Sequence, residues 1–263
     1  MECMCSLSRF EKGTVVISID DGNADDFRLY ENILSKYGLS ATFNIISGKI
    51  GKEGSLTVEQ LRTIYNDPAM EIAAHGYAHQ NDDEDVRRGI AELYGWLGIS
   101  EPWIGFASPG SQMKNAHIKQ NQDHLRELGL LYVRTAGNPE ASPKHEELQR
   151  KLKSTGASDY VVRNVPQLTY SFEDMCVNSV VVYHRTELAD LKELIDLAAE
   201  ERACIVLMFH RTKKKGEWNY DEEWCYDYDC FEELAAYLDQ RRGEGRIDIL
   251  TTRQAFCVGS AHD

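Results

Sequence analysis

VVISIDDGNADD (residues 15–26) begins as an apolar run rich in β-branched residues and ends in adjacent acids and a glycine. Such a run is typical of a buried strand, and the polar residues after it mark the strand's end. A helical spacing of apolar residues follows, from about Ala24 to Tyr37. The stretch therefore predicts a strand and a helix, with Asp20 and Asp21 at the carboxyl end of the strand.

Apolar runs and helical spacings alternate along most of the chain. Further strands are predicted at ATFNII (41–46), MEIAA (70–74), IGFAS (104–108), LLYVRT (130–135), YVVRNV (160–165), SVVVYH (179–184), ACIVLMFH (203–210) and IDILTT (247–252). Helices are predicted at 57–66, 82–97, 117–128, 188–201 and 231–242, while 137–158 is polar and without a clear pattern. The alternation predicts an α/β fold with a parallel sheet, closed into a barrel or open and doubly wound.

Composition narrows the classes of protein and partner. The 263 residues, 42% of them hydrophobic, suit one domain over 1–263. The excess of 43 acidic over 29 basic residues argues against nucleic acid and anionic membranes as partners. We find no apolar leader and no run of about 18 apolar residues, so we expect a cytoplasmic protein, or a secreted one whose leader has been removed. Seven cysteines do not form a disulfide framework.

Polar groups follow four of the predicted strands directly. Asp20 and Asp21 end the first, His75 follows MEIAA, SPG (108–110) follows IGFA, and His210 follows CIVLMF. In barrels and in open parallel sheets the functional residues lie at the carboxyl ends of the strands. These groups are therefore predicted to meet at one rim.

The segment HGYAHQ (75–80) places His75 four residues before His79. Two imidazoles and a carboxylate leave positions open for water and substrate, which is typical of a catalytic metal site. Zinc is the first choice, and cobalt, nickel, manganese or iron also suit mixed N and O ligands. The same ligand types occur in non-haem iron oxygenases, but the alternation of strands and helices disfavours that class.

Together these segments resemble the metal-dependent polysaccharide deacetylases, also called the NodB-homology family or carbohydrate esterase family four. SIDDG (18–22) is similar to the family's TFDDG motif, and HGYAH (75–79) to H-[ST]-x-x-H, with glycine in the hydroxyl position. ASPGS (107–111) aligns with R-x-P-[YF]-G, and LMFH (207–210) with the final leucine–histidine motif. The resemblance covers about residues 15–252 and implies a distorted (β/α)7 barrel.

The resemblance also implies an activity, the removal of an acetyl group from an N- or O-acetylated saccharide by metal-activated water. The roles it implies are a general base at Asp20, a general acid at His210, metal ligands at Asp21, His75 and His79, and an oxyanion or substrate site at Pro109 and Gly110. A hydrolase of a non-sugar amide and a non-catalytic sugar-binding relative are the alternatives.

Two departures from the family pattern affect these roles. The arginine of the third motif, which pairs with the catalytic aspartate in the family, is replaced by Ala107. Arg134 is the candidate substitute because it lies near the carboxyl end of the next predicted strand, although an ordinary salt bridge at the rim would explain it equally well. The motif D-x-x-[DN]-W is not visible, so the sequence names no partner for His210.

Overall fold

The computed structural model describes residues 9–137 and 139–260. Its strands are β1 (Gly13–Asp21), β2 (Ala41–Ile45), β3 (Met70–Ala74), β4 (Ile104–Ala107), β5 (Leu130–Thr135), β6 (Cys176–Asn178), β7 (Val180–Val181), β8 (Cys204–Phe209), β9 (Arg211–Lys213), β10 (Cys225–Asp227) and β11 (Ile247–Ile249). Its α-helices are α1 (Ala24–Leu29), α2 (Ser35–Tyr37), α3 (Val58–Tyr65), α4 (Asp83–Leu97), α5 (Asn115–Gln120), α6 (Gln122–Glu127), α7 (Pro143–Thr155), α8 (Asp159–Asn164), α9 (Leu188–Glu201), α10 (Tyr228–Gly243) and α11 (Thr252–Gly259). None of the helices within these described ranges is long and apolar enough to cross a bilayer.

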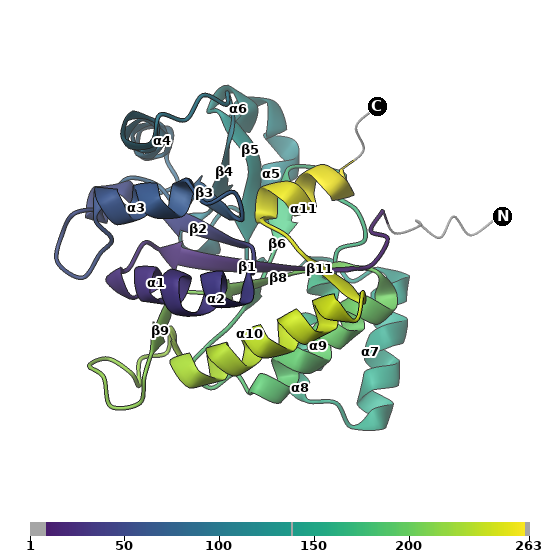
Figure 1. The fold of residues 1–263 in the computed structure, drawn as a ribbon. Helices are drawn as coiled ribbons and strands as arrows, with labels where there is room; N and C mark the ends of the chain where they lie inside the picture. Colours follow the sequence, from purple (N-terminus) through teal and green to yellow (C-terminus); the bar gives the residue numbers. More distant parts are fainter. Residues whose placement is uncertain (1–8, 138, 261–263) are drawn as a thin grey trace.

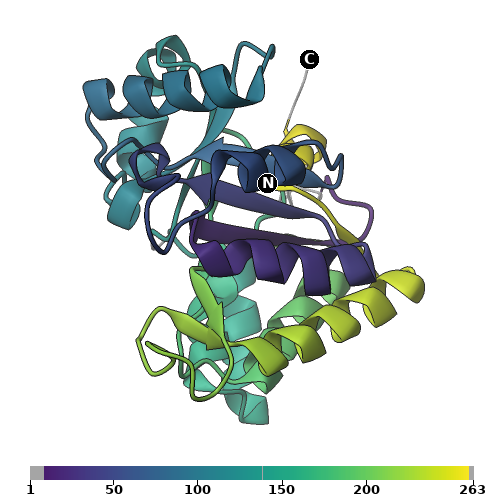
Figure 2. The ribbon, with the colours of Figure 1, turned by 60° about the vertical axis from the view of Figure 1, so that its left-hand side comes forward.

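The main sheet is parallel throughout. Its strands lie in the order β6-β5-β4-β3-β2-β1-β8-β7, and β11 pairs with the first residues of β1. Helices cover the strands from both sides, with α3 and α4 above them and α8, α9 and α10 below in Figure 1, and the same separation in the rotated view of Figure 2. The carboxyl ends of the strands consequently share one rim.

The two ends of this sheet are joined through a single residue. β6 pairs with β5 (Thr135↔Asn178), β7 pairs with β8 (Val180↔Leu207), and between β6 and β7 lies Ser179. The segment 176–181 therefore links both edges and nearly closes the sheet into a barrel. The register shift between β4 and β5 is one of its irregularities. The predicted distorted (β/α)7 barrel is confirmed.

A small apolar cluster fills the barrel interior. It contains Val16, Tyr132, Val177 and Val206 from the strands and Phe256 from α11, and it is distinct from the larger cluster between strands and helices. Side chains alternate between the two faces of a strand, so one set of alternate residues lines the interior from end to end. On β1 this set continues from Val16 to Asp20, which brings Asp20 to the rim.

The end of the barrel opposite the rim holds a buried hydrogen-bond network around Glu71, the second residue of β3. The hydroxyl of Tyr132 donates to Glu71 at 2.9 Å, as does that of Thr42, and the backbone N–H of Arg253 donates at 2.8 Å. Tyr132 passes Gly105, where a Cβ atom would lie 2.2 Å from its hydroxyl oxygen. Burial raises the pKa of Glu71 above its ordinary value, and this effect exceeds the opposing effect of the donors.

One sequence-based prediction of structure was wrong, and one segment without a clear pattern proves to be helical. YVVRNV (160–165) was expected to be a strand, but it forms α8 and the turn after it, because Ser158 caps the helix and packing buries Val161 and Val162 on one side. The polar region 137–158 contains α7, which begins at a capping box formed by Ser142 and His145. Packing of α8 against α9 outweighs the strand preference of valine.

Candidate active site

A cavity of about 690 Å³ opens at the carboxyl ends of the strands. Six of the site residues predicted from the sequence line it: Asp20, Asp21, His75, His79, Gly110 and His210. The rest of the lining consists of Ser108, Ser111, Lys114, Ala136, Val181, Tyr183, Met208, Arg211, Asn219, Glu222 and Trp224. The fold thus brings together side chains from β1, from the segments after β3, β4 and β8, and from residues 219–224, just before β10.

Asp20 is buried, and its carboxylate is held by Arg134 and Asn44. Arg134 Nη2 donates to Asp20 Oδ1 at 2.5 Å and also contacts Oδ2, and Asn44 Nδ2 donates to Oδ1 at 2.8 Å. Burial raises the pKa of Asp20, but the charges of Arg134, His75 and His210 together lower it by more than burial raises it. The pKa of Asp20 is therefore below its ordinary value. Asp20 is consequently charged at neutral pH although it is 2% exposed.

Arg134 reaches Asp20 from the strand next to the one that carries Ala107. Ala107 on β4 and Arg134 on β5 are register partners, so the arginine stands one strand away from the position where the family motif has it. Its guanidinium is fully buried and also contacts the sulfur of Met208. Asn44 was not predicted, although an asparagine inside the predicted strand ATFNII could have indicated it.

Asp21, His75 and His79 offer ligand atoms that all lie within 4.8 Å of one another. Ligand atoms about 2.0–2.1 Å from a tetrahedral zinc lie roughly 3.3 Å apart. His75 Nε2 and Asp21 Oδ1 are 3.9 Å apart, and the rings of His75 and His79 have their centroids at 4.7 Å. The three groups therefore fit a cation between them.

The protonation of His75 suits a metal ligand. Its Nδ1–H donates to the carbonyl of Ala107 at 2.7 Å, which leaves Nε2 with a free lone pair facing the two aspartates. Burial lowers the pKa of His75 to about 4. The imidazole is therefore neutral near pH 7, as coordination requires.

His210 stands across the cavity from these groups. Its Nε2 is 4.0 Å from Asp20 Oδ2, and its ring packs against Trp224 at 4.7 Å between centroids. Burial lowers the pKa of His210 more than the nearby carboxylates raise it. Within the described residues its buried Nδ1 has no hydrogen-bond partner, and no carboxylate orients the ring. Packing against Trp224 is the contact that fixes it.

Pro109 and Gly110 form a tight turn directly after β4. Gly110 has φ of +56°, a conformation that favours glycine, and it lines the cavity, while Pro109 is buried beneath it. Ser108 anchors the turn, because its hydroxyl donates to Asn81 Oδ1 at 2.8 Å and accepts from the N–H of Met113 at 2.9 Å.

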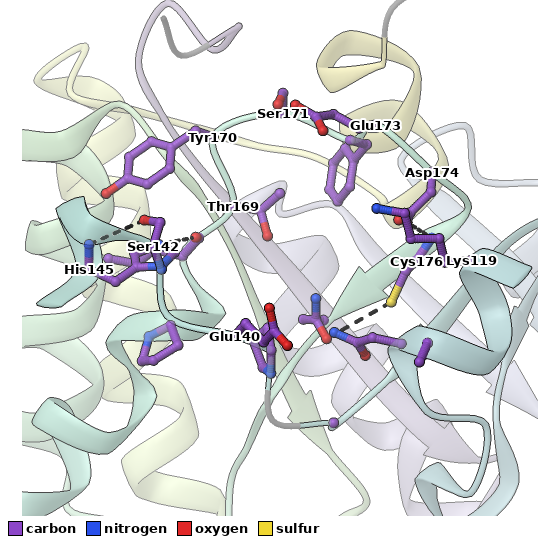
Figure 3. Close-up of a pocket in the computed structure, with 18 of the residues that line it drawn as sticks. Lys119, Glu140, Ser142, His145, Thr169, Tyr170, Ser171, Glu173, Asp174 and Cys176 are labelled. Carbon is purple, nitrogen blue, oxygen red and sulfur yellow. Dashed lines mark hydrogen bonds between the residues drawn. The ribbon is translucent and has the colours of Figure 1, made fainter. Parts of the chain in front are cut away.

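A second cavity, of about 820 Å³, is drawn in Figure 3. Lys114 and Ala136 line both cavities, so the two adjoin. The histidine of the second cavity, His145, already uses both ring nitrogens, since Nδ1 accepts from the N–H of Ser142 and Nε2 donates to a backbone carbonyl. Across the described chain, the group of side chains able to hold a metal lies in the first cavity. The candidate metal-binding group therefore belongs to the smaller cavity.

A family model described as polysaccharide deacetylase matches residues 8–133. No curated protein matches the chain. Among solved structures, the chain is similar to IcaB from Ammonifex degensii, with 22% identity over 49% of this chain and 68% of that one, at a TM-score of 0.40. It is similar to the deacetylase PplD of Streptococcus pyogenes in complex with acetate, with 21% identity over 49% of this chain and 58% of that one, at a TM-score of 0.40.

A third similar structure, a family 4 acetyl xylan esterase from Clostridium thermocellum with a cobalt ion, covers 93% of this chain and 91% of its own at 15% identity and a TM-score of 0.45. The matched residues 8–133 include SIDDG and HGYAH, the first two motifs on which the resemblance rests. The expectation of a hydrolase acting on amide or ester bonds is thereby confirmed at the level of the family that this segment matches: over residues 8–133 the chain is similar to the polysaccharide deacetylases.

Proposed function

We propose that this protein is a metal-dependent hydrolase that removes an acetyl group from an N- or O-acetylated saccharide. The observation that carries the proposal is the position of Asp20. It is a buried carboxylate kept charged by Arg134, and its Oδ2 lies 3.8 Å from His75 and 4.0 Å from His210. A residue that only made a turn would not need a buried guanidinium.

Asp21, His75 and His79 would hold the metal, and zinc remains the first choice among divalent ions. The fit rests on the free Nε2 of His75 and on three protein ligands, which leave positions open. When bound, the ion would lower the pKa of a water molecule and polarise the acetyl carbonyl.

Asp20 would act as the general base. Its carboxylate is deprotonated at neutral pH, and Arg134 and Asn44 fix its orientation. A proton leaving water near His75 would therefore meet a carboxylate oxygen already aimed at it. Arg134 serves as the positioning residue in place of the motif arginine.

His210 would give a proton to the departing amine or alkoxide from the opposite wall. Such a hydrolysis requires a carboxylate that is charged before it accepts the proton of water and an imidazole that can supply a proton to the leaving group. Gly110 borders the same cavity, and its backbone N–H would bind the carbonyl oxygen as negative charge develops on it, while Pro109 beneath it shapes the turn.

A saccharide is favoured by the aromatic wall of the cavity. Trp224 is 43% exposed there and packs against Tyr183 at 5.3 Å between ring centroids. Aromatic faces suit the apolar faces of sugar rings. A non-sugar amide would need no such wall, and a non-catalytic sugar-binding protein would need no buried base.

The test combines metal analysis with acetate release from N-acetyl and O-acetyl substrates, with and without a chelator. Asp20→Asn is expected to keep the metal and to lose about 100-fold or more of the rate, as removal of a general base does. Glu71→Gln, a change of the buried carboxylate at the other end of the barrel, should leave the rate within about twofold of wild type. Acetate release by Asp20→Asn at the wild-type rate would contradict the assigned base, and turnover insensitive to chelator would contradict the metal.

A further inference from the structure

The segment between the two candidate metal ligands His75 and His79 is an irregular loop in a demanding conformation. Gly76 has φ of +77°, and His79, which is not a glycine, has φ of +63°. A non-glycine residue in the left-handed region persists where its surroundings impose it. Something must therefore hold this loop in shape.

Asp85, in the first turn of α4, provides that restraint. Its Oδ2 accepts the backbone N–H groups of Tyr77 at 2.9 Å and Gln80 at 3.0 Å, and its Oδ1 accepts that of Ala78 at 2.7 Å. The side chain is buried, and the N–H of Asp85 is itself held by Asp82 Oδ1 at 3.1 Å. One carboxylate thus organises three of the four residues that follow Gly76.

The carbonyl groups of the loop are held from the other side. The N–H of Ser47 donates to the carbonyl of Gly76 at 3.1 Å, and the N–H of Gly48 donates to that of Tyr77 at 3.0 Å. A Cβ atom on Gly89 of α4 would lie 2.7 Å from the Gly76 carbonyl carbon. The loop is therefore clamped between α4 and the turn after β2.

Gly76 and Asp85 compete for the same space. A Cβ atom at position 76 would lie 2.4 Å from Asp85 Oδ2. Position 76 is where the family motif has serine or threonine, and here glycine stands there. The absence of a side chain at 76 is what allows the Asp85 carboxylate to approach the loop backbone.

We infer that Asp85 is a positioning residue for the candidate metal site, a role that rests on the proposed function. It does not contact the metal, but by fixing the backbone from Tyr77 to Gln80 it holds the imidazole of His79 beside His75 and Asp21. Without it, His79 samples other positions and the site loses one of its three ligands for part of the time.

The test is the affinity for Zn²⁺, measured in solution by competition with a chromophoric chelator. Asp85→Asn keeps the size of the side chain but turns an N–H₂ group toward backbone N–H groups, so the Zn²⁺ dissociation constant is expected to rise about 10- to 100-fold. Asp85→Ala should raise it at least as much. Activity of Asp85→Asn should return at high Zn²⁺ concentration, which a general loss of structure would not allow.

Two control variants separate this role from effects on the helix or on charge. Asp82→Ala removes the N-cap of α4 and its bond to the Asp85 N–H, but it leaves the three bonds from the Asp85 carboxylate to the loop in place. It should therefore lower the melting temperature and raise the Zn²⁺ dissociation constant clearly less than Asp85→Asn does. Glu84→Gln removes the same charge from the neighbouring exposed position and should change neither quantity.

The outcomes distinguish the two proposals. If wild-type protein binds no Zn²⁺, both the metal site and the role of Asp85 are wrong. If wild type binds Zn²⁺ and folded Asp85→Asn binds it equally well, Asp85 alone is wrongly assigned. An Asp85→Asn protein that does not fold at low temperature would also overturn the inference, because Asp85 would then be a residue of the fold.

Discussion

The barrel holds a buried carboxylate at each end, and the partners of the two differ. Asp20 at the rim touches Arg134, whose guanidinium is fully buried. Glu71 at the opposite end is bonded to hydroxyl and backbone donors, and its nearest guanidinium, that of Arg253, lies 3.8 Å away and is partly exposed. The pKa of Asp20 is lowered, whereas that of Glu71 is raised.

The comparison teaches that burial does not by itself decide the charge of a carboxylate. Around Asp20 the charges of Arg134, His75 and His210 together outweigh the loss of water, because little solvent screens them. Around Glu71, the neutral hydrogen-bond donors and the solvent-screened Arg253 do not outweigh the loss of water. One end therefore keeps a charge that a base can use, and the other contributes structure.

The largest expected effect comes from removing the buried cation. Arg134→Met should lower the free energy of unfolding by about 3–5 kcal/mol at pH 7, because it leaves the charge of Asp20 buried and unpaired. Urea denaturation measures this value. Arg253→Met, the matched change near Glu71, should cost less than about 1 kcal/mol. Equal losses in the two variants would erase the difference between the ends.

Removing the charge as well should restore part of the stability. In the double variant Asp20→Asn/Arg134→Met, about 1–3 kcal/mol of the loss from Arg134→Met is expected to return, since no unpaired charge remains. Acetate release by the double variant should be at least about 100-fold slower than that of wild type, because the proposed base is absent. A double variant no more stable than Arg134→Met would show that the two residues are not coupled.

Asp20 and Glu71, at the two ends of the barrel, should change the free energy of unfolding with pH in opposite directions. The folded pKa of Asp20 lies below its ordinary value of 3.8, so its contribution is present above pH 3.8 and lost as pH falls further. The folded pKa of Glu71 lies above 4.5, so stability falls as pH rises from 4.5 toward that pKa. Each slope is at most about 1.4 kcal/mol per pH unit.

Single variants show which residue causes each slope. Chemical denaturation from pH 2.5 to 8 should show that Asp20→Asn removes the slope below pH 3.8 and that Glu71→Gln removes the one above 4.5. A Glu71→Gln curve parallel to that of wild type across the upper window would show that Glu71 is ionised when folded.

The smallest effect is expected at the structural end. Tyr132→Phe removes one donor to Glu71 and should cost about 1 kcal/mol in the free energy of unfolding, the usual value for a hydrogen bond. The ratio kcat/KM for acetate release should stay within twofold of wild type. A tenfold fall in kcat/KM would mean that the two ends of the barrel communicate.

Much of the fold could be predicted because its strands are short apolar runs ended by polar groups. MEIAA and LLYVRT form β3 and β5 with the predicted bounds. Residues 160–165 were mispredicted because their valines satisfy a strand pattern locally, and packing against other helices makes them helical. Such long-range packing leaves no periodic mark in the sequence.

Some residues of the candidate site could also be predicted from the sequence, and others could not. Asp20, His75 and His210 could be located because each is the first polar group at the end of a strand, and Arg134 because it occupies the corresponding place on β5. Asp85 could not, since it is one of several acids in NDDED (81–85) and only the fold turns it inward. Residues that act through backbone contacts carry no motif of their own.

The pairing of β1 with β8 has a consequence for folding. β1 lies between β2, which follows it closely in the chain, and β8, which comes far later. While the chain is being synthesised, the apolar strand that carries Asp20 keeps one edge of unpaired backbone groups until residues 204–209 have emerged. An open apolar edge of this kind pairs readily with other chains. A truncated chain that ends before β8 is therefore expected to aggregate, even though it contains the whole segment matched by the family.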